Sequence, residues 1–475
     1  MWRKGSIELV GMLFIFGLWL AFSVNQAQAV PSFARQTGFQ CNVCHTIFPE
    51  LTPVGRNFKL NGYTASKTPN KPYPWPPPIA AMVQLSLTHL AKSMPAGSYD
   101  PTNRGNDNVN VPQAISLFYG GRLYGDHLGA FVQGTYDGVA NKFFLDNTDI
   151  RGVVRPELFG KPLILGLTLN NNPTVSDVYN TTPAWGFPYA APADDTALFP
   201  GAGPQIAGLG GLVGGVGGYF YWNNLVYGEM AVYRNARQGP FQFLGAGTVT
   251  DPMIQDVIPY WRVFLQHQWG KHSLMVGHFG MVSRNLSDKA YSDIPNLIDT
   301  HGPVDVFTDL GFDAQYQYIS RKHIVTVKTS FINEAQHLND TYSQRGGAGS
   351  FHDRLWLDTF QINGSYYYRT DQWGTVGGTV GFTNIWGERD RVFYGPEAGD
   401  GSRTGKPNST YWIFELDYVP WWQEFVTKIS LQYTVYTQFN GAYSNYDGNS
   451  VDTYPYSPRN ASNNNSLYLL IWQMF

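Results

Sequence analysis

Charged side chains are scarce in this sequence, and so are cysteines and long apolar runs. Only 14% of the residues are charged, the net charge is −3, and aromatic residues reach 16%. Soluble domains usually carry about 25% charged residues, so something other than a solvated, charged surface must cover this chain. After the N-terminus no run of about 18 consecutive apolar residues occurs, which excludes helical membrane spans there. A wall of β-strands that faces lipid would account for both deficits.

The two cysteines lie in one motif, which excludes a disulfide framework. Cys41, Cys44 and His45 form the pattern C-x-x-C-H, in which two thiols bond to one haem and the adjacent imidazole ligates its iron. A zinc site would need further Cys or His ligands at matching spacing, and a redox C-x-x-C would need a thioredoxin-like βαβ context. Neither context is present. The motif therefore predicts one covalently bound haem c, with His45 as the proximal ligand.

The ligand on the other face of the haem iron is harder to identify. No Met or His occurs between Thr46 and Ala81, so a strong distal ligand must come from beyond a proline-rich stretch. Residues alternate between apolar and mixed types from Ile79 to Thr88, which turns Met82 towards the inside of a predicted strand. The nearest candidates are Met82, His89 and Met94, and the alternation favours Met82 as the distal ligand. Alternatively Met82 only packs, and the iron is five-coordinate or takes Lys, Tyr or water.

The N-terminus has the pattern of an export signal. Arg3 and Lys4 precede an apolar run over residues 9–24, and the small-residue triplet Ala27-Gln28-Ala29 follows. A retained anchor helix is the alternative, but the run is short for a bilayer span. We expect a signal peptide over residues 1–29, a haem segment over 30–68, a proline-rich linker over 69–78 and a transmembrane barrel over 79–475.

The remaining chain alternates between apolar and polar residues with a period of two. Between Val306 and Tyr318, Val, Leu, Phe and Tyr interleave with Asp, Gly and Gln, which predicts a strand with one lipid face and one wet face. Short turns and long loops separate such strands, and counting the strands predicts about sixteen. The long loops are expected near residues 91–112, 172–212, 236–256, 283–303, 334–353, 387–408 and 440–463.

This pattern predicts an all-β fold: an outer-membrane β-barrel of about sixteen strands whose lumen is plugged by the small N-terminal haem segment. The chain ends on Phe475, which resembles the assembly signal of bacterial outer-membrane proteins, although Gln473 departs from the usual apolar residue. A soluble sandwich or propeller would need strands that face a dry core and usually a fixed repeat. No fixed repeat occurs.

The region around the haem motif resembles the fused monohaem cytochrome-porins of iron(II)-oxidising bacteria. The resemblance covers about residues 31–63, whereas over the barrel it rests on length and strand pattern alone. The residues that carry it are Ser32–Gly38, Cys41–His45, Pro49, Leu51, Gly55, Arg56, Phe58, Lys59, Gly62 and Tyr63.

That resemblance implies an oxidoreductase of the outer membrane, which oxidises extracellular Fe(II) and passes electrons to a periplasmic cytochrome c or blue-copper protein. By position it assigns Cys41 and Cys44 to haem attachment and His45 to the iron. The haem segment is expected in the lumen or at its periplasmic side, outer-membrane lipid is a further expected contact, and no nucleic acid is expected. Loop carboxylates could bind iron on chemistry alone: Asp194, Asp195, Glu388, Asp390, Glu397 and Asp400.

Two other functions are compatible with the sequence. The chain could be a transport porin whose haem segment is a structural or gating plug. It could also export electrons to an external acceptor, with the same architecture used in reverse.

Overall fold

The computed structural model describes residues 32–67, 77–93, 106–192, 199–236, 239–247, 253–286, 303–344, 352–395, 401–420, 426–448 and 458–475. The predicted signal peptide and most of the proline-rich linker lie outside the described residues. Of the six loop carboxylates, only Glu388 and Asp390 fall within them. Among the described residues, no helix is long and apolar enough to cross a membrane.

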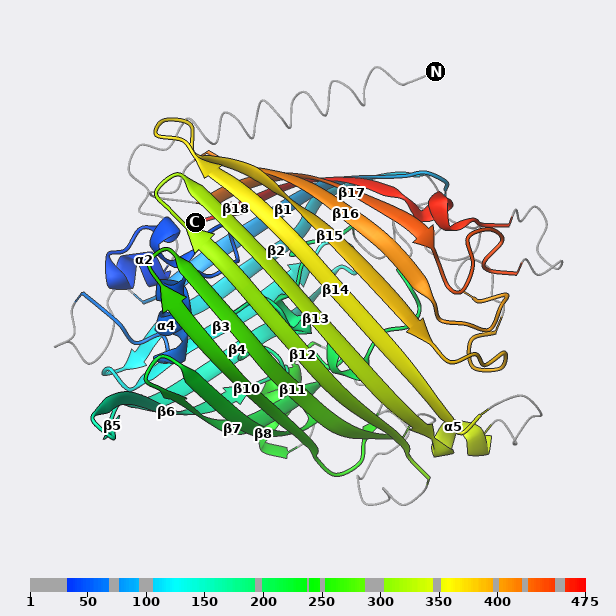
Figure 1. Cartoon of the computed structure of the whole chain (residues 1–475), viewed down its shortest axis with the longest axis horizontal. Coiled ribbons are helices and arrows are strands. Elements are labelled where there is room, and N and C mark those ends of the chain that lie inside the picture. The colour runs from blue at the N-terminus through cyan, green and yellow to red at the C-terminus, as the bar shows by residue number, and fades with distance from the viewer. Residues whose placement is uncertain are drawn as a thin grey trace.

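Strands dominate the described chain and join into one sheet (Figure 1). Their bounds are β1 (Ile79–Leu90), β2 (Asp107–Tyr124), β3 (Leu128–Asp137), β4 (Lys142–Val154), β5 (Glu157–Leu158), β6 (Lys161–Asn170), β7 (Val213–Trp222), β8 (Val226–Asn235), β9 (Met253–Ile254), β10 (Ile258–Trp269), β11 (His272–Leu286), β12 (Asp305–Ile319), β13 (His323–Leu338), β14 (Arg354–Arg369), β15 (Thr375–Gly387), β16 (Ser409–Val419), β17 (Val426–Gln438) and β18 (Ser466–Met474).

The sheet closes into a barrel. Apart from the two-residue strands β5 and β9, each strand pairs antiparallel with its neighbours along the chain, and β18 pairs with β1 to complete the ring. Of the eighteen strands, sixteen therefore form the wall. The predicted all-β barrel of about sixteen strands is confirmed.

The alternation in the sequence determines which way each side chain points. On β12, Asp313, Gln315 and Gln317 are buried on the inner side, whereas Leu310 and Phe312 are 39% and 58% exposed on the outer side. An apolar outer face with a polar inner face is the pattern of a barrel embedded in lipid. The inward orientation expected for Met82 is also confirmed, because its side chain is only 4% exposed.

Connections are short at one end of the barrel and mostly long at the other. The short end carries tight turns, such as residues 125–127, 270–271 and 320–322, and the C-terminus lies at this end (Figure 1). Several strands run further towards the long-loop end than the sequence suggested: β2 begins at Asp107, β11 continues to Leu286 and β13 to Leu338. Backbone pairing continues there even where the side chains no longer alternate clearly.

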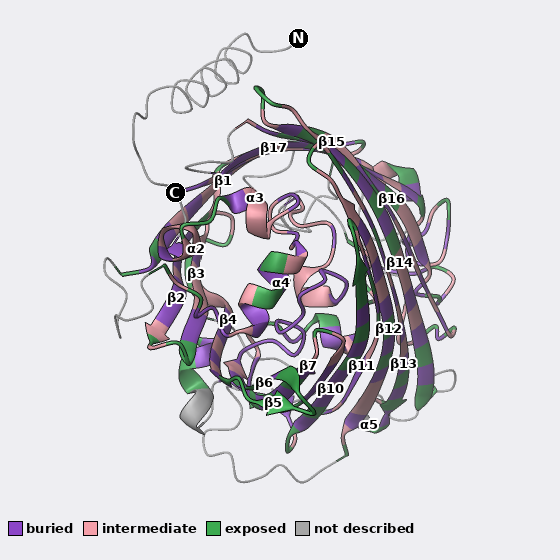
Figure 2. Ribbon diagram, turned by 60° about the vertical axis from the view of Figure 1, so that its left-hand side comes forward, coloured by how far each residue is buried: buried purple, intermediate pink, exposed green. Residues whose placement is uncertain are grey.

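Two segments fill the lumen. The first contains helices α2 (Ser32–Thr37), α3 (Cys41–Cys44) and α4 (Pro53–Leu60), and Figure 2 shows α3 and α4 inside the ring of strands. The second is the β6–β7 connection, described over residues 171–192 and 199–212, whose first part is almost completely buried. We call these the N-terminal segment (32–67) and the inserted loop (171–212). The sequence predicted the second one only as a long outer loop.

Candidate functional site

The C-x-x-C-H motif lies on the short helix α3. Cys41 and Cys44 are three positions apart, so one helical turn brings both thiols to the same face, and the His45 amide closes the turn by donating to the Cys41 carbonyl at 2.9 Å. Both cysteines are free thiols in the structure. Burial raises the pKa of each to about 11, so both remain protonated at neutral pH.

The imidazole of His45 is oriented by its own loop. Its Nδ1 lies 3.3 Å from the carbonyl oxygen of Pro49. A proton on Nδ1 would donate to this oxygen and leave Nε2 free to bind a metal, which is the usual second-shell arrangement of a histidine ligand. Burial also lowers the pKa of His45 to about 4, which keeps the ring neutral. A neutral, oriented imidazole is the form that ligates iron.

Helix α4 supports the motif through Thr52 and Gly55. The Thr52 side chain accepts a hydrogen bond from the Gly55 amide at 3.2 Å and donates to the Val43 carbonyl at 2.6 Å, so one residue caps α4 and ties it to α3. A Cβ atom at position 55 would lie 2.2 Å from the Cys44 carbonyl oxygen. Only glycine allows this close approach, which explains its place in the N-terminal segment.

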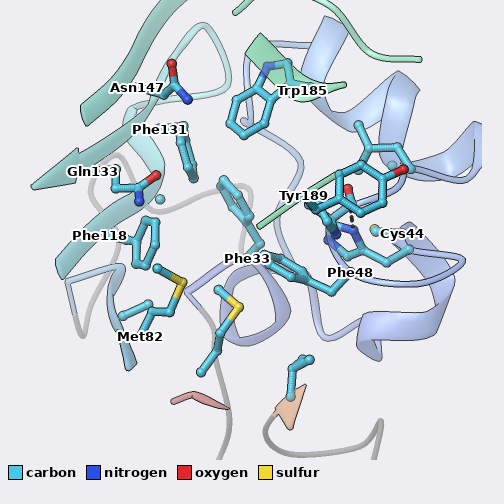
Figure 3. Close-up of a pocket in the computed structure, with 18 of the residues that line it drawn as sticks. Phe33, Cys44, Phe48, Met82, Phe118, Phe131, Gln133, Asn147, Trp185 and Tyr189 are labelled. Carbon is cyan, nitrogen blue, oxygen red and sulfur yellow. Dashed lines mark hydrogen bonds between the residues drawn. The ribbon is translucent and has the colours of Figure 1, made fainter. Parts of the chain in front are cut away.

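The thiols and the imidazole face a cavity of about 470 Å³ between the N-terminal segment, the inserted loop and the barrel wall. Figure 3 shows Met82, Phe118 and Phe131 along one side and Cys44 and Phe48 on the other. This volume lies within the range of ligand pockets in proteins. Other apolar side chains that line the cavity are Phe33, Leu51, Phe58, Trp185, Val426, Trp472 and Met474.

These residues fit a covalently held haem. The site brings together two free thiols, an oriented neutral imidazole and a largely apolar cavity, and that combination is the set of groups that c-type attachment needs. The part of the chain that the structure describes has no cluster of three or more His, Cys, Asp or Glu side chains that could form a metal cage. The donor set therefore suits haem iron better than a bare metal ion.

The hydrogen bonds of the side chains that line the cavity also bear on which of them could serve as the sixth ligand of a haem iron. Lys59 Nζ donates to the Val175 and Asp177 carbonyls at 2.7 and 2.9 Å, and Tyr63 donates to Asp149 at 2.6 Å. These side chains are already engaged in other interactions. The thioether of Met82 is buried beside the cavity and needs no hydrogen-bond partner.

Met474 is a second buried thioether at this cavity, and the sequence reasoning missed it. It is the direct cross-strand partner of Met82 where β18 pairs with β1, and it is 6% exposed. Its inward position follows from the alternation along β18, in which Leu470, Trp472 and Met474 are buried. What the sequence lacked was the register that places it opposite Met82.

A buried ion pair fixes the N-terminal segment to the wall and to the inserted loop. Glu50 accepts from Lys328 on β13 at 2.8 Å and from Thr326 at 2.6 Å, and Tyr189 of the inserted loop donates to the same carboxylate at 3.1 Å. Burial alone would raise the pKa of Glu50, but the Lys328 ammonium and the hydrogen bonds from Lys328, Thr326 and Thr46 hold it below the ordinary value. The carboxylate therefore stays charged near neutral pH.

Two arginines add further contacts of this kind. We call the buried contacts of Glu50, Arg56 and Arg262 with the wall and the inserted loop the clamp. Arg56 donates to Gln315 and Gln317 at 3.0 Å each, and its guanidinium lies 4.7 Å from the ring centre of Tyr179 in the inserted loop. Arg262 on β10 bridges Asp177 of the inserted loop and Asp313 of the wall at 3.1 and 2.7 Å. These contacts join the N-terminal segment, the inserted loop and the barrel wall inside the lumen.

The two described loop carboxylates, Glu388 and Asp390, belong to no cluster of metal-binding side chains among the described residues. Asp390 is 1% exposed, and its side chain accepts from the backbone amides of Val392 and Phe393 at 2.7 and 2.8 Å and from that of His352 at 2.7 Å. These bonds hold a loop in place, as Asp does in a turn. Glu388 is half-buried and joins no metal-binding cluster among the described residues.

No known family profile matches this sequence, and no curated protein matches it. Solved structures with a similar course of the chain include OmpT of Vibrio cholerae in its trimer form, at 9% identity and a TM-score of 0.40 over 84% of this chain and 98% of that one. An anion-selective porin from Comamonas acidovorans gives 9% and 0.40 over 83% and 98%. The outer membrane channel DcaP of Acinetobacter baumannii gives 7% and 0.39 over 84% and 96%. At these values the likeness carries no argument about function.

The architecture itself establishes where the chain resides. A closed, even-numbered antiparallel barrel with an apolar outer face, turns at one end and long loops at the other is the form of outer-membrane proteins. Closure leaves no free sheet edge, which is the condition for strands to cross lipid. The protein is an outer-membrane β-barrel whose lumen holds the C-x-x-C-H segment.

Proposed function

We propose that this protein transfers electrons across the outer membrane through one covalent haem, taking them from extracellular Fe(II) and passing them to a periplasmic cytochrome c or blue-copper protein. Cys41 and Cys44 attach the haem, His45 is the proximal ligand and Met82 is the distal ligand. The observation that carries the proposal is the position of the motif. Its thiols and imidazole face a largely apolar cavity within the barrel lumen.

Position inside the barrel is what makes a single haem useful. The apolar belt of such barrels is about 25 Å tall, and electron tunnelling falls steeply with distance. A haem outside the membrane would leave that distance unbridged, whereas a haem in the lumen divides it into shorter steps. When bound, the haem supplies a centre that takes up one electron and releases one. Each Fe(II) oxidised to Fe(III) yields that electron.

The chain's own residues prepare this centre. Pro49 orients the His45 ring, and burial keeps the ring neutral. The lining of the cavity is largely apolar, which favours a raised reduction potential, as would a thioether on the iron. Arg369 at the end of β14 donates to the Asn42 and His45 carbonyls at 3.3 and 3.4 Å and holds the motif at the short-turn end.

The contents of the lumen favour electron transfer over solute transport. The N-terminal segment and the inserted loop are joined to the wall by the buried pairs Glu50–Lys328 and Arg262–Asp177. Displacing these segments from the lumen would require separating such charges within the protein, which is strongly unfavourable for buried pairs. A gating plug that leaves the lumen during transport would have to break these contacts.

The test is anaerobic stopped-flow absorbance of the purified, haem-loaded protein mixed with Fe(II). We expect the absorption bands of reduced c-type haem to appear, and a periplasmic carrier added in oxidised form to reoxidise them. If Fe(II) leaves the haem oxidised although dithionite reduces it, the proposal is wrong. Solute permeation through the haem-loaded barrel, without redox exchange, would instead establish the porin function.

A further inference from the structure

The cavity that the haem motif lines changes from apolar to polar along the barrel wall. On β1, Met82 is followed towards the long-loop end by Gln84. On β2, Phe118 gives way to Ser116 in the same direction, and on β3 Phe131 gives way to Gln133 and Thr135, which also line the cavity. The end near the turns is therefore apolar, and the end towards the long loops is polar.

A β-bulge brings a carboxylate into this polar end. The pairing of β3 with β4 shifts between Val132 and Gly134, so that Asp146 and Asn147 together oppose the single residue Gln133. An extra residue in one strand re-aims side chains, and bulges recur next to functional sites. Here both Asp146 and Asn147 line the cavity, and Figure 3 shows Asn147 and Gln133 at its edge.

Asp146 differs from the other carboxylate that lines the cavity. Asp177 forms an ion pair with Arg262, whereas Asp146 receives only neutral donors among the described residues: the Asn147 amide at 2.8 Å and the Thr135 hydroxyl at 3.1 Å. Asp146 is half-buried, and a carboxylate that is partly removed from water without a cation partner is stabilised when a positive charge joins it. The site has room for that charge because it faces the cavity.

The inserted loop adds a second polar group that lacks a partner. Asn180 lines the same cavity and is 5% exposed, and its Oδ1 atom has no hydrogen-bond partner among the described residues. Its Nδ2 donates to the carbonyl of Trp185, whose ring lies 6.0 Å from that of Phe131 on β3. Gln133 contributes a similar oxygen, because its Nε2 donates to Ser116 and Thr135 at 3.2 and 3.3 Å and leaves Oε1 available.

We propose that this polar end is a docking subsite for a hydrated divalent cation, with Asp146 as its charged partner and the amide oxygens of Asn180 and Gln133 as acceptors for its waters. Carboxylate, amide and water oxygens are the ligands of hard divalent cations. The inference rests on the proposed function and names the place from which Fe(II) would deliver its electron. One carboxylate gives a weak site, which suits a substrate that must leave as Fe(III).

The test uses Mn(II), a divalent cation that this protein has no means to oxidise, and measures its binding to the haem-loaded protein by the electron paramagnetic resonance signal of free Mn(II). We expect Asp146→Asn to weaken Mn(II) binding by at least about tenfold. Asp146→Glu keeps the charge and should retain binding. Asp353→Asn removes the same charge from an exposed site at the long-loop end and should change nothing.

Kinetics separate this inference from the proposed function. Asp146→Asn should slow haem reduction at low Fe(II) by a similar factor, while reduction by dithionite stays at the wild-type rate. Mn(II) binding that is equal in wild type and Asp146→Asn would overturn the subsite, and so would an equal loss in Asp353→Asn. If Mn(II) binds at Asp146 but Fe(II) never reduces the haem, the subsite stands and Fe(II) oxidation falls.

Discussion

The barrel wall and the contents of its lumen are built from contacts of different range. In the wall, almost every strand pairs with the strand before and after it, and only the β18–β1 seam joins distant parts of the sequence. In the lumen, Glu50 and Lys328 are 278 positions apart and Arg56 and Gln315 are 259 apart. Backbone pairing holds the wall, whereas buried side-chain charges hold the lumen. The two regions should therefore respond separately to substitution.

The largest expected effect removes the haem site and leaves the wall intact. His45→Ala deletes the proximal ligand, so the absorption spectrum of a ligated c-type haem should disappear completely. Among the described residues no backbone hydrogen bond joins the wall to α3, so the folded barrel should still migrate as a heat-modifiable band in gels. His127→Ala, in the exposed β2–β3 turn, is the matched control and should retain the spectrum. Loss of the folded band in His45→Ala would show that the two regions fold as one unit.

The second-largest expected effect weakens the clamp and leaves the wall intact. Glu50→Gln leaves the Lys328 ammonium buried without its partner, which typically costs about 3–5 kcal/mol. We expect the N-terminal segment to become sensitive to protease and the haem spectrum to melt at lower temperature, while the barrel band is unchanged. Replacing both residues, as Glu50→Gln with Lys328→Met, should restore much of the loss. An equal loss in the double variant would mean that the ion pair is not the cause.

Acid should act on the same clamp. Because the pKa of Glu50 is lowered in the folded protein, its charge stabilises the docked segment fully above the ordinary carboxyl value of 4.5. That contribution is lost as the pH falls through the lowered pKa, so protease sensitivity of the segment should rise in this range for the wild type. Glu50→Gln should show a smaller dependence on pH there.

The contrast between local contacts in the wall and long-range contacts in the lumen also determines which features the sequence could predict. A period of two is a local signal, so the strands of the wall, their approximate number and the inward side of Met82 follow from it. The C-x-x-C-H motif is equally local. The burial of residues 171–182 depends on partners such as Arg262 and Asp313, and no local pattern reveals these.

The pairing register between neighbouring strands is the other feature that the sequence does not reveal. The bulge that turns Asp146 inward exists only as a mismatch between β3 and β4, and the contact between Met82 and Met474 exists only because the barrel closes. Neither can be read from one strand alone. Asp390 was a candidate from its chemistry, but its oxygens are used by backbone amides that become neighbours only in the folded loop.

The smallest effect concerns two methionines on one seam. Figure 3 shows Met82 on the side of the cavity opposite Cys44 and Phe48. Phe48 packs 5.3 Å from the His45 ring and 5.1 Å from the ring of Trp472, which shares the inner face of β18 with Met474. Met82 and Met474 pair directly across the seam and both line the cavity, so substitution has to separate the proposed ligand Met82 from its neighbour.

Met82→Leu should then remove the weak sulfur-to-iron charge-transfer band of the oxidised haem and lower its reduction potential, because a thioether ligand raises it. Met474→Leu should keep the band, and so should Met275→Leu, which changes a buried methionine of the wall away from this cavity. Leucine preserves the volume closely, so packing should change little. A band that survives Met82→Leu but is lost in Met474→Leu would reverse the assignment. A band that survives both would mean that the seam provides no ligand, and that the two regions meet at the haem through packing alone.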